Sequence, residues 1–116
     1  MHETAVTKKI FETTISHANA NQAVRVLGVH IEIGGLSDLE ENWMQRFFDY
    51  FTKGSIAEGA KLYVARKPIV IECGKCKKHF EMDFKGIRNL HCPHCGNGTG
   101  RVISGKEYII TNIDII

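Results

Sequence analysis

The stretch that decides the fold reads Cys73-Gly74-Lys75-Cys76 and, after a gap of fifteen residues, Cys92-Pro93-His94-Cys95. These two pairs contain all four cysteines of the chain. Each C-x2-C turn presents two sulfurs, and two such turns folded together make the tetrahedral four-thiolate shell that binds zinc. We therefore expect a structural zinc site formed by Cys73, Cys76, Cys92 and Cys95.

The spacing alone leaves other uses of the cysteines open. Four tetrahedral thiolates also suit iron, as in a site of rubredoxin type. Two disulfides would suit a secreted chain, but no charged and then apolar signal segment opens the sequence, so we expect a reducing compartment. A redox C-x-x-C motif usually occurs once, near a βαβ pattern, whereas this motif occurs twice.

Length and composition limit the architecture and the classes of function. A chain of 116 residues accommodates one compact domain and a small module around the cysteines, and the module has too little core to fold without a metal. The net charge of +2 comes without a long run of Lys or Arg, which argues against a dedicated nucleic-acid surface. The longest apolar run is too short to span a bilayer, so we expect a cytoplasmic protein without membrane contact.

Hydrophobic periodicity predicts a helix, a strand, a second helix and a second strand before the cysteines. The first helix covers residues 4–19, and its apolar face consists of Val6, Ile10, Phe11, Ile15 and Ala18. Period-two alternation predicts the strands at residues 25–33 and 61–66. These elements predict a small α/β domain at the N-terminal end.

The second helix is expected at residues 37–53. Ser37 and Glu40 have the spacing of a capping box, and Gly54 is a natural stop. The helix has an aromatic-rich stripe at helical spacing, which we interpret as core rather than as a binding groove. This stripe consists of Leu39, Trp43, Phe47, Tyr50 and Phe51.

The last strand is expected at residues 107–116, and the cysteine module offers it little apolar cover. We therefore expect this strand to return to the first sheet. The predicted fold is α+β. A small mixed sheet packed by two helices forms one domain from residues 1–67 and 104–116, and a zinc-ribbon-like domain covers residues 68–103.

The opening residues Met1-His2-Glu3 offer a second group of metal ligands. The N-terminal amine, the His2 amide nitrogen and the His2 imidazole can close two fused chelate rings, and the Glu3 amide can complete a planar nitrogen set. Ni(II) and Cu(II) prefer this geometry and zinc does not. A histidine at position 2 is also common as a solvated residue at a frayed terminus, so the motif alone does not establish a metal site.

Three histidines lie close to the cysteines in the sequence, namely His79, His91 and His94. Such residues could sense the metal, exchange with a thiolate or approach the nickel. The simpler alternative is a solvated histidine, or one that lies beside the metal site without binding the ion. We treat the three as auxiliary candidates.

Taken in order, these motifs resemble those of the HypA/HybF family of nickel metallochaperones. The resemblance covers nearly the whole chain. It includes Met1-His2-Glu3, residues 33–37 (IGGLS), residues 52–62 (TKGSIAEGAKL), both cysteine pairs and residues 102–107 (VISGKE). It implies a carrier that delivers Ni(II) during maturation of [NiFe]-hydrogenase and, in some organisms, of urease.

The resemblance also implies ligands and partners. Nickel would be held by the amine of Met1, the amides of His2 and Glu3 and the His2 side chain, while Zn(II) is structural. A HypB-type GTPase would act with the carrier, and the hydrogenase large subunit would receive the nickel. We expect a monomer or a weak dimer.

A zinc-ribbon module that binds nucleic acid is the alternative function. Its basic residues would be Lys75, Lys77, Lys78, Lys85 and Arg88, but they lack the interleaved aromatic residues that stack on bases. An enzyme is not expected, because a zinc ion closed off by four thiolates has no open position and the chain has no glycine-rich phosphate loop.

Overall fold

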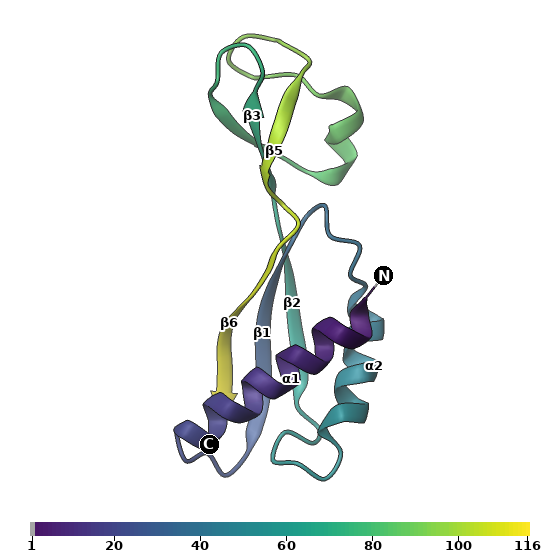
Figure 1. The fold of residues 1–116 in the computed structure, drawn as a ribbon, viewed down its shortest axis with the longest axis vertical. Coiled ribbons are helices and arrows are strands. Elements are labelled where there is room, and N and C mark those ends of the chain that lie inside the picture. Colours follow the sequence, from purple (N-terminus) through teal and green to yellow (C-terminus); the bar gives the residue numbers. More distant parts are fainter. Residues whose placement is uncertain (1) are drawn as a thin grey trace. The chain divides into compact units, whose positions relative to one another are not determined.

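The computed structural model describes residues 2–116, which divide into two compact units (Figure 1). The first unit contains the residues up to Glu32 together with Asp38–Ala65 and Ile109–Ile116. The second contains Ile33–Ser37 and Arg66–Tyr108. Within the described residues, no helix combines the length and the apolar character needed to cross a membrane.

The first unit is built on a three-stranded sheet with the order β2-β1-β6 and two helices that pack against each other (Figure 1). The helices are α1 (Glu3–Ala20) and α2 (Glu41–Thr52). The strands are β1 (Val26–Gly34), β2 (Lys61–Lys67) and β6 (Tyr108–Ile115). This confirms the predicted α+β class.

The sheet of the first unit is mixed. Gly28 approaches Lys61, and further along both strands Gly35 approaches Lys67, so β1 and β2 run parallel. At one end of the β1–β6 pair, Val24 donates to the carbonyl of Ile116 at 2.7 Å. At the other end Gly34 donates to Glu107 at 2.8 Å, so these two strands run antiparallel. The C-terminal strand therefore returns to the first sheet, as predicted.

The first helix buries a narrower face than its apolar residues indicated. Its fully buried positions are Thr7, Ile10, Thr14 and Ala18. Val6, Phe11 and Ile15 are only half-buried. Ile10 and Ala18 agree with the prediction, but two threonines occupy core positions that hydrophobicity does not mark.

The second helix begins later than predicted, and the prediction that Ser37 and Glu40 form a capping box is wrong. Glu40 is the N-cap, and its carboxylate accepts hydrogen bonds from the backbone N–H groups of Asn42 and Trp43 at 3.4 and 3.2 Å. A capping carboxylate stabilises the positive helix start in the same way as a serine hydroxyl. Ser37 therefore lies outside the helix that begins at Glu41.

The aromatic stripe of α2 is mostly not core, which corrects the prediction. The buried positions of the helix are Met44, Phe48 and Thr52, spaced four residues apart. Trp43 and Tyr50 are 51% and 67% exposed. Phe47 and Phe51 are half-buried, and Leu39, which precedes the helix, is buried as expected. Because each residue turns a helix by about 100°, a stripe shifted by one position faces a different neighbour.

The second unit contains a three-stranded antiparallel sheet with the order β4-β3-β5 (Figure 1). Its elements are β3 (Ile69–Cys73), β4 (His79–Met82), the 3-10 helix η1 (Phe84–Asn89) and β5 (Gly100–Ser104). Ile69, Ile71 and Cys73 alternate as the buried side of β3. The β4 strand ends at Met82, and Phe84 opens η1.

Candidate metal centres

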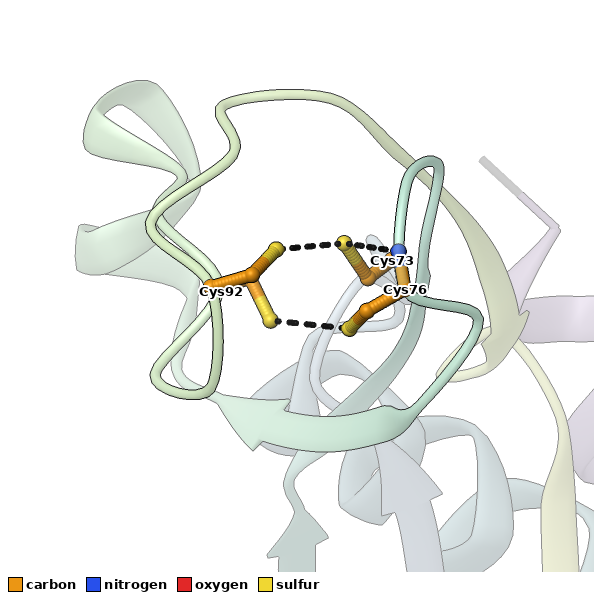
Figure 2. Close-up of side chains that lie close together, drawn as sticks. Cys73, Cys76 and Cys92 are labelled. Atoms are coloured by element: carbon orange, nitrogen blue, oxygen red, sulfur yellow. Dashed lines mark hydrogen bonds between the residues drawn. The ribbon is translucent and has the colours of Figure 1, made fainter.

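The four cysteines of the second unit converge on one point. Cys73 ends β3 and Cys76 lies in the turn toward β4, while Cys92 and Cys95 lie in the turn between η1 and β5. All four Sγ atoms lie within 4.8 Å of one another. Figure 2 shows Cys92 facing Cys73 and Cys76 across the space between the two turns. Among residues 2–116, this is the only group of three or more His, Cys, Asp or Glu side chains close enough to share an ion.

The sulfur separations fit a tetrahedral metal site and do not fit disulfides. Sγ of Cys73 lies 3.5 Å from Sγ of Cys95, and Sγ of Cys76 lies 3.6 Å from Sγ of Cys92. Zinc bonds of about 2.3 Å place tetrahedral sulfurs roughly 3.8 Å apart, whereas a disulfide needs about 2.05 Å. All four cysteines are free thiols. The cluster is therefore consistent with a zinc site.

The two cysteine turns share one backbone geometry. Lys77 donates to the carbonyl of Cys73 at 3.2 Å, and Gly96 donates to the carbonyl of Cys92 at 2.8 Å. The residue after the second cysteine has a positive φ in both turns, 64° at Lys77 and 78° at Gly96. Glycine accepts this conformation without strain, whereas a lysine does not. The first turn therefore stores strain at Lys77.

Gly74 is needed for close packing rather than for the turn itself. A Cβ atom at Gly74 would lie 2.8 Å from Oγ1 of Thr99. The Gly74 backbone N–H also donates to the carbonyl of Thr99 at 2.9 Å. This contact places the segment before β5 against the first cysteine turn.

Backbone N–H groups polarise the sulfurs unequally. The N–H groups of Cys76 and Lys75 both point at Sγ of Cys73 at 3.4 Å, and together they lower the pKa of that thiol to about 6. The N–H of Lys78 acts to lower the pKa of Cys76, but burial and hydrogen bonds to neighbouring thiols outweigh it and raise the pKa to about 11. Without metal, Cys73 is thus the first of this pair to ionise.

The lowered pKa of Cys73 links the stability of the metal-free unit to pH. The folded Cys73 thiol has a lower pKa than its ordinary value of 9.0, so its ionisation favours the folded state at high pH, whereas the raised pKa of Cys76 acts in the opposite direction. That contribution is complete above about pH 9 and is lost as the pH falls through about 6. Acid therefore weakens the cluster by restoring the proton that a metal must displace.

The three auxiliary histidines lie outside the sulfur cluster. Nε2 of His79 lies 3.5 Å from Oε2 of Glu72, and Nδ1 of His91 lies 2.8 Å from the carbonyl oxygen of Asn89. His94 is exposed, and its backbone N–H donates to Sγ of Cys92 at 3.4 Å. His94 thus contacts the site through its backbone. A role for the three imidazoles stays a prediction.

The predicted nickel ligands lie at the start of α1. Met1 falls outside the described residues. His2 is exposed and is the N-cap residue, and its carbonyl accepts from the N–H of Val6 at 3.0 Å. Glu3 is the first helical residue, and its carboxylate accepts from the backbone N–H of Glu40 at 3.1 Å. This hydrogen bond connects the beginning of α1 to the beginning of α2.

The exposed aromatic face of α2 was missed as a surface feature by sequence reasoning. Trp43 stacks on Phe47 at 6.1 Å between ring centroids, and the Arg46 guanidinium lies 5.2 Å from the centre of the Trp43 ring. Beside them is a groove of about 380 Å³, lined by Thr4, Arg46, Phe47, Tyr50 and Phe51. The four-residue spacing of Met44, Phe48 and Thr52 could have indicated this surface, because it marks a second stripe of the helix that could be buried in place of the aromatic one.

Comparison with known proteins identifies the class. The family model described as "Hydrogenase/urease nickel incorporation, metallochaperone, hypA" matches residues 1–115. A hydrogenase maturation factor HypA from Shewanella oneidensis is 31% identical over 115 residues, covering 99% of this chain and 95% of that protein. A protein of the same name from Methanothermobacter thermautotrophicus is 32% identical over 125 residues, covering 99% of this chain and 97% of that one.

Solved structures show the same fold. The solution structure of the Ni metallochaperone HypA from Helicobacter pylori superposes with a TM-score of 0.69 at 21% identity, covering 100% of this chain and 98% of that one. The fold, the sulfur cluster and the matched family together define a nickel metallochaperone of hydrogenase maturation, which is not an enzyme. The chain belongs to the HypA family.

The strain at Lys77 gives a first test. We expect Lys77→Gly to raise the free energy of unfolding of the zinc-loaded protein by about 0.5–1 kcal/mol, because glycine relieves the positive φ. Lys75→Gly in the same turn is the control. It should lower stability slightly, since only flexibility is added there. Chemical denaturation measures both, and equal effects of the two variants would contradict the assignment.

Proposed function

We propose that this chain binds Ni(II) at its N-terminus and delivers it to the metal centre of [NiFe]-hydrogenase. The ligands are the amine of Met1, the backbone amide nitrogens of His2 and Glu3, and the His2 imidazole. The observation that carries the proposal is the position of His2 and Glu3 at the start of α1. A helix makes no intrahelical hydrogen bond from its first N–H groups, so a metal can use these nitrogens without breaking the helix.

Electrostatics favours this arrangement. Two deprotonated amides bring two negative charges, which cancel the charge of Ni(II). A neutral complex avoids the repulsion that a bare cation meets at the positive end of a helix. Protons compete for the same amides, so the binding is reversible and acid releases the ion.

The hydrogen bond between Glu3 and Glu40 supports the site indirectly. It holds the Glu3 side chain against the N-cap of α2. The first turn of α1 is thereby fixed before the ion arrives. A site that is already ordered loses less conformational entropy on binding.

We further propose that Cys73, Cys76, Cys92 and Cys95 hold a structural Zn(II). The buried hydrophobic residues of the second unit are few, namely Ile33, Ile69, Ile71, Cys73 and Cys92. A core of this size does not offset the entropy of ordering the surrounding turns, and zinc binding supplies the difference. On this proposal residues 1–67 and 104–116 form the nickel-binding domain and residues 68–103 the zinc-binding domain.

The nickel site is tested at His2. We expect His2→Ala to abolish one-to-one Ni(II) binding, because the imidazole closes the chelate, and to leave zinc content and fold unchanged, because the side chain is exposed. His17→Ala is the matched control, since His17 is exposed on the same helix, and it should bind nickel normally. Acetylation of the Met1 amine should also abolish binding, since it converts the amine into an amide without supplying a new one.

Isothermal titration of untagged protein with Ni(II), with zinc measured in parallel, gives the readout. Tight stoichiometric nickel in the His2→Ala variant would overturn the ligand assignment. Loss of nickel in the His17→Ala variant would show that the effect is not specific to the N-terminus.

The partners we propose are a HypB-type GTPase and the hydrogenase large subunit, in the cytoplasm. The groove beside the aromatic face supports a protein partner, because Thr4 lines it two residues after His2. We propose that the GTPase places an apolar segment in this groove and a carboxylate against Arg46. The carrier acts as a monomer or a weak dimer, and we expect no nucleic-acid partner for a chain of net charge +2.

The docking proposal predicts a loss of affinity for the GTPase. Trp43→Ala and Tyr50→Ala should each weaken binding about tenfold or more, because exposed aromatic anchors carry much of the energy of such interfaces. Tyr63→Ala is the control, as Tyr63 is 45% exposed on β2 of the same unit. Titration of the GTPase into nickel-loaded protein measures all three, and unchanged affinity in both α2 variants would remove the groove as the docking site.

A further inference from the structure

The four sulfurs of the cluster differ in their access to solvent. Cys73 and Cys92 are buried, with 0% and 3% of their surface exposed, and Cys76 is half-buried. Cys95 is exposed. A reagent dissolved in water therefore reaches one sulfur before the other three.

The sulfurs also differ in the hydrogen bonds that they accept. Cys73 accepts from the N–H groups of Lys75 and Cys76 and lies 3.9 Å from the side-chain amide of Asn97. Cys92 accepts from the N–H of His94. Cys76 accepts from the N–H of Lys78. Among the hydrogen bonds described for residues 2–116, none joins an N–H to Sγ of Cys95, whose polar neighbours are the thiols of Cys73, at 3.5 Å, and of Cys76.

Solvent access and the lack of N–H···S hydrogen bonds both raise the reactivity of a sulfur toward an electrophile. An N–H···S hydrogen bond withdraws electron density from a thiolate and makes it a poorer nucleophile, and burial blocks the approach of an electrophile. Oxidation of cysteine follows thiolate character and exposure. In the zinc-bound protein all four sulfurs are thiolates, so exposure decides which one reacts first, and Cys95 is the exposed one.

We propose that Cys95 is a peroxide-sensitive site through which oxidation releases the zinc. This inference rests on the proposed zinc site. The Cys95 thiolate attacks one oxygen of hydrogen peroxide, an S–O bond forms, the O–O bond breaks and hydroxide leaves. The sulfur is oxidised to a sulfenic acid and the peroxide is reduced.

The structure supplies the second thiol at the right place. Sγ of Cys73, 3.5 Å away, attacks the Cys95 sulfur, so that an S–S bond forms, the S–O bond breaks and hydroxide leaves. The Cys73–Cys95 disulfide removes two of the four ligands. Cys76 and Cys92 alone do not retain the ion against solvent, while the ligands at the start of α1 are untouched.

The test uses the full-length, zinc-loaded protein and limiting amounts of hydrogen peroxide or of an alkylating maleimide. Peptide mass spectrometry should find Cys95 modified at least about fivefold faster than any other cysteine. With peroxide, a disulfide between Cys73 and Cys95 should accumulate together with free zinc, which a chromogenic chelator detects. Faster labelling of Cys73, Cys76 or Cys92, or another disulfide as the first product, would overturn the proposal.

Two variants separate the role of Cys95 from that of the whole cluster. Cys95→His keeps a zinc ligand but removes the exposed sulfur, and should slow zinc release by peroxide about tenfold. Lys75→Ala changes an exposed side chain of the other cysteine turn, leaves all four sulfurs in place, and should release zinc as fast as the unmodified protein. Equal rates in the two variants would contradict the proposal. A protein that holds no zinc before peroxide is added contradicts the zinc site itself, which is a separate failure.

Discussion

The second unit depends on one constraint, which is that four sulfurs from two distant turns lie within 4.8 Å of one another. Four thiolates at that spacing repel each other unless a cation lies between them. Several backbone features bring the four sulfurs together. Cys73 ends a buried strand, matched turns place Cys76 and Cys95, and the Gly74–Thr99 contact holds the segment before β5 against the first turn. A closed shell of four sulfurs has no position for a substrate, in agreement with a family of carriers.

The proposed cargo site follows a different rule. A carrier must release its ion, so its ligands should be few, exposed and easily protonated. The start of α1 meets these conditions, because its backbone nitrogens are not engaged in the helix and His2 is exposed. The chemistry of the donors then separates the metals: planar nitrogens favour Ni(II), and tetrahedral sulfurs favour zinc. The same chain can thus hold two ions without exchanging them.

Much of this was predictable from sequence, and the failures have physical causes. The cysteine spacing, the two helices and the returning β6 strand follow from ligand geometry and apolar periodicity. The prediction that the aromatic stripe of α2 is buried was wrong, because Met44 and Phe48 have the same helical spacing as Trp43 and Phe47. Which of the two stripes is buried depends on the elements that pack against the helix, and the helix sequence does not show this. Thr7 and Thr14 are core residues with no hydrophobic signal. The positive φ at Lys77 was not predictable, because a glycine usually indicates such a position and here the residue is a lysine. The unequal hydrogen bonding of the sulfurs was not predictable either, because it depends on the directions of backbone N–H groups, which no sequence motif specifies.

The central claim is that nickel is held by nitrogen alone and zinc by sulfur alone, in one chain. X-ray absorption at the nickel and zinc edges of the untagged protein, loaded with both ions, tests this most directly. The account predicts a planar nickel site with nitrogen neighbours and no sulfur, together with a zinc site of four sulfurs at about 2.3 Å. Sulfur in the nickel shell, or a zinc shell with fewer than four sulfurs, would contradict it.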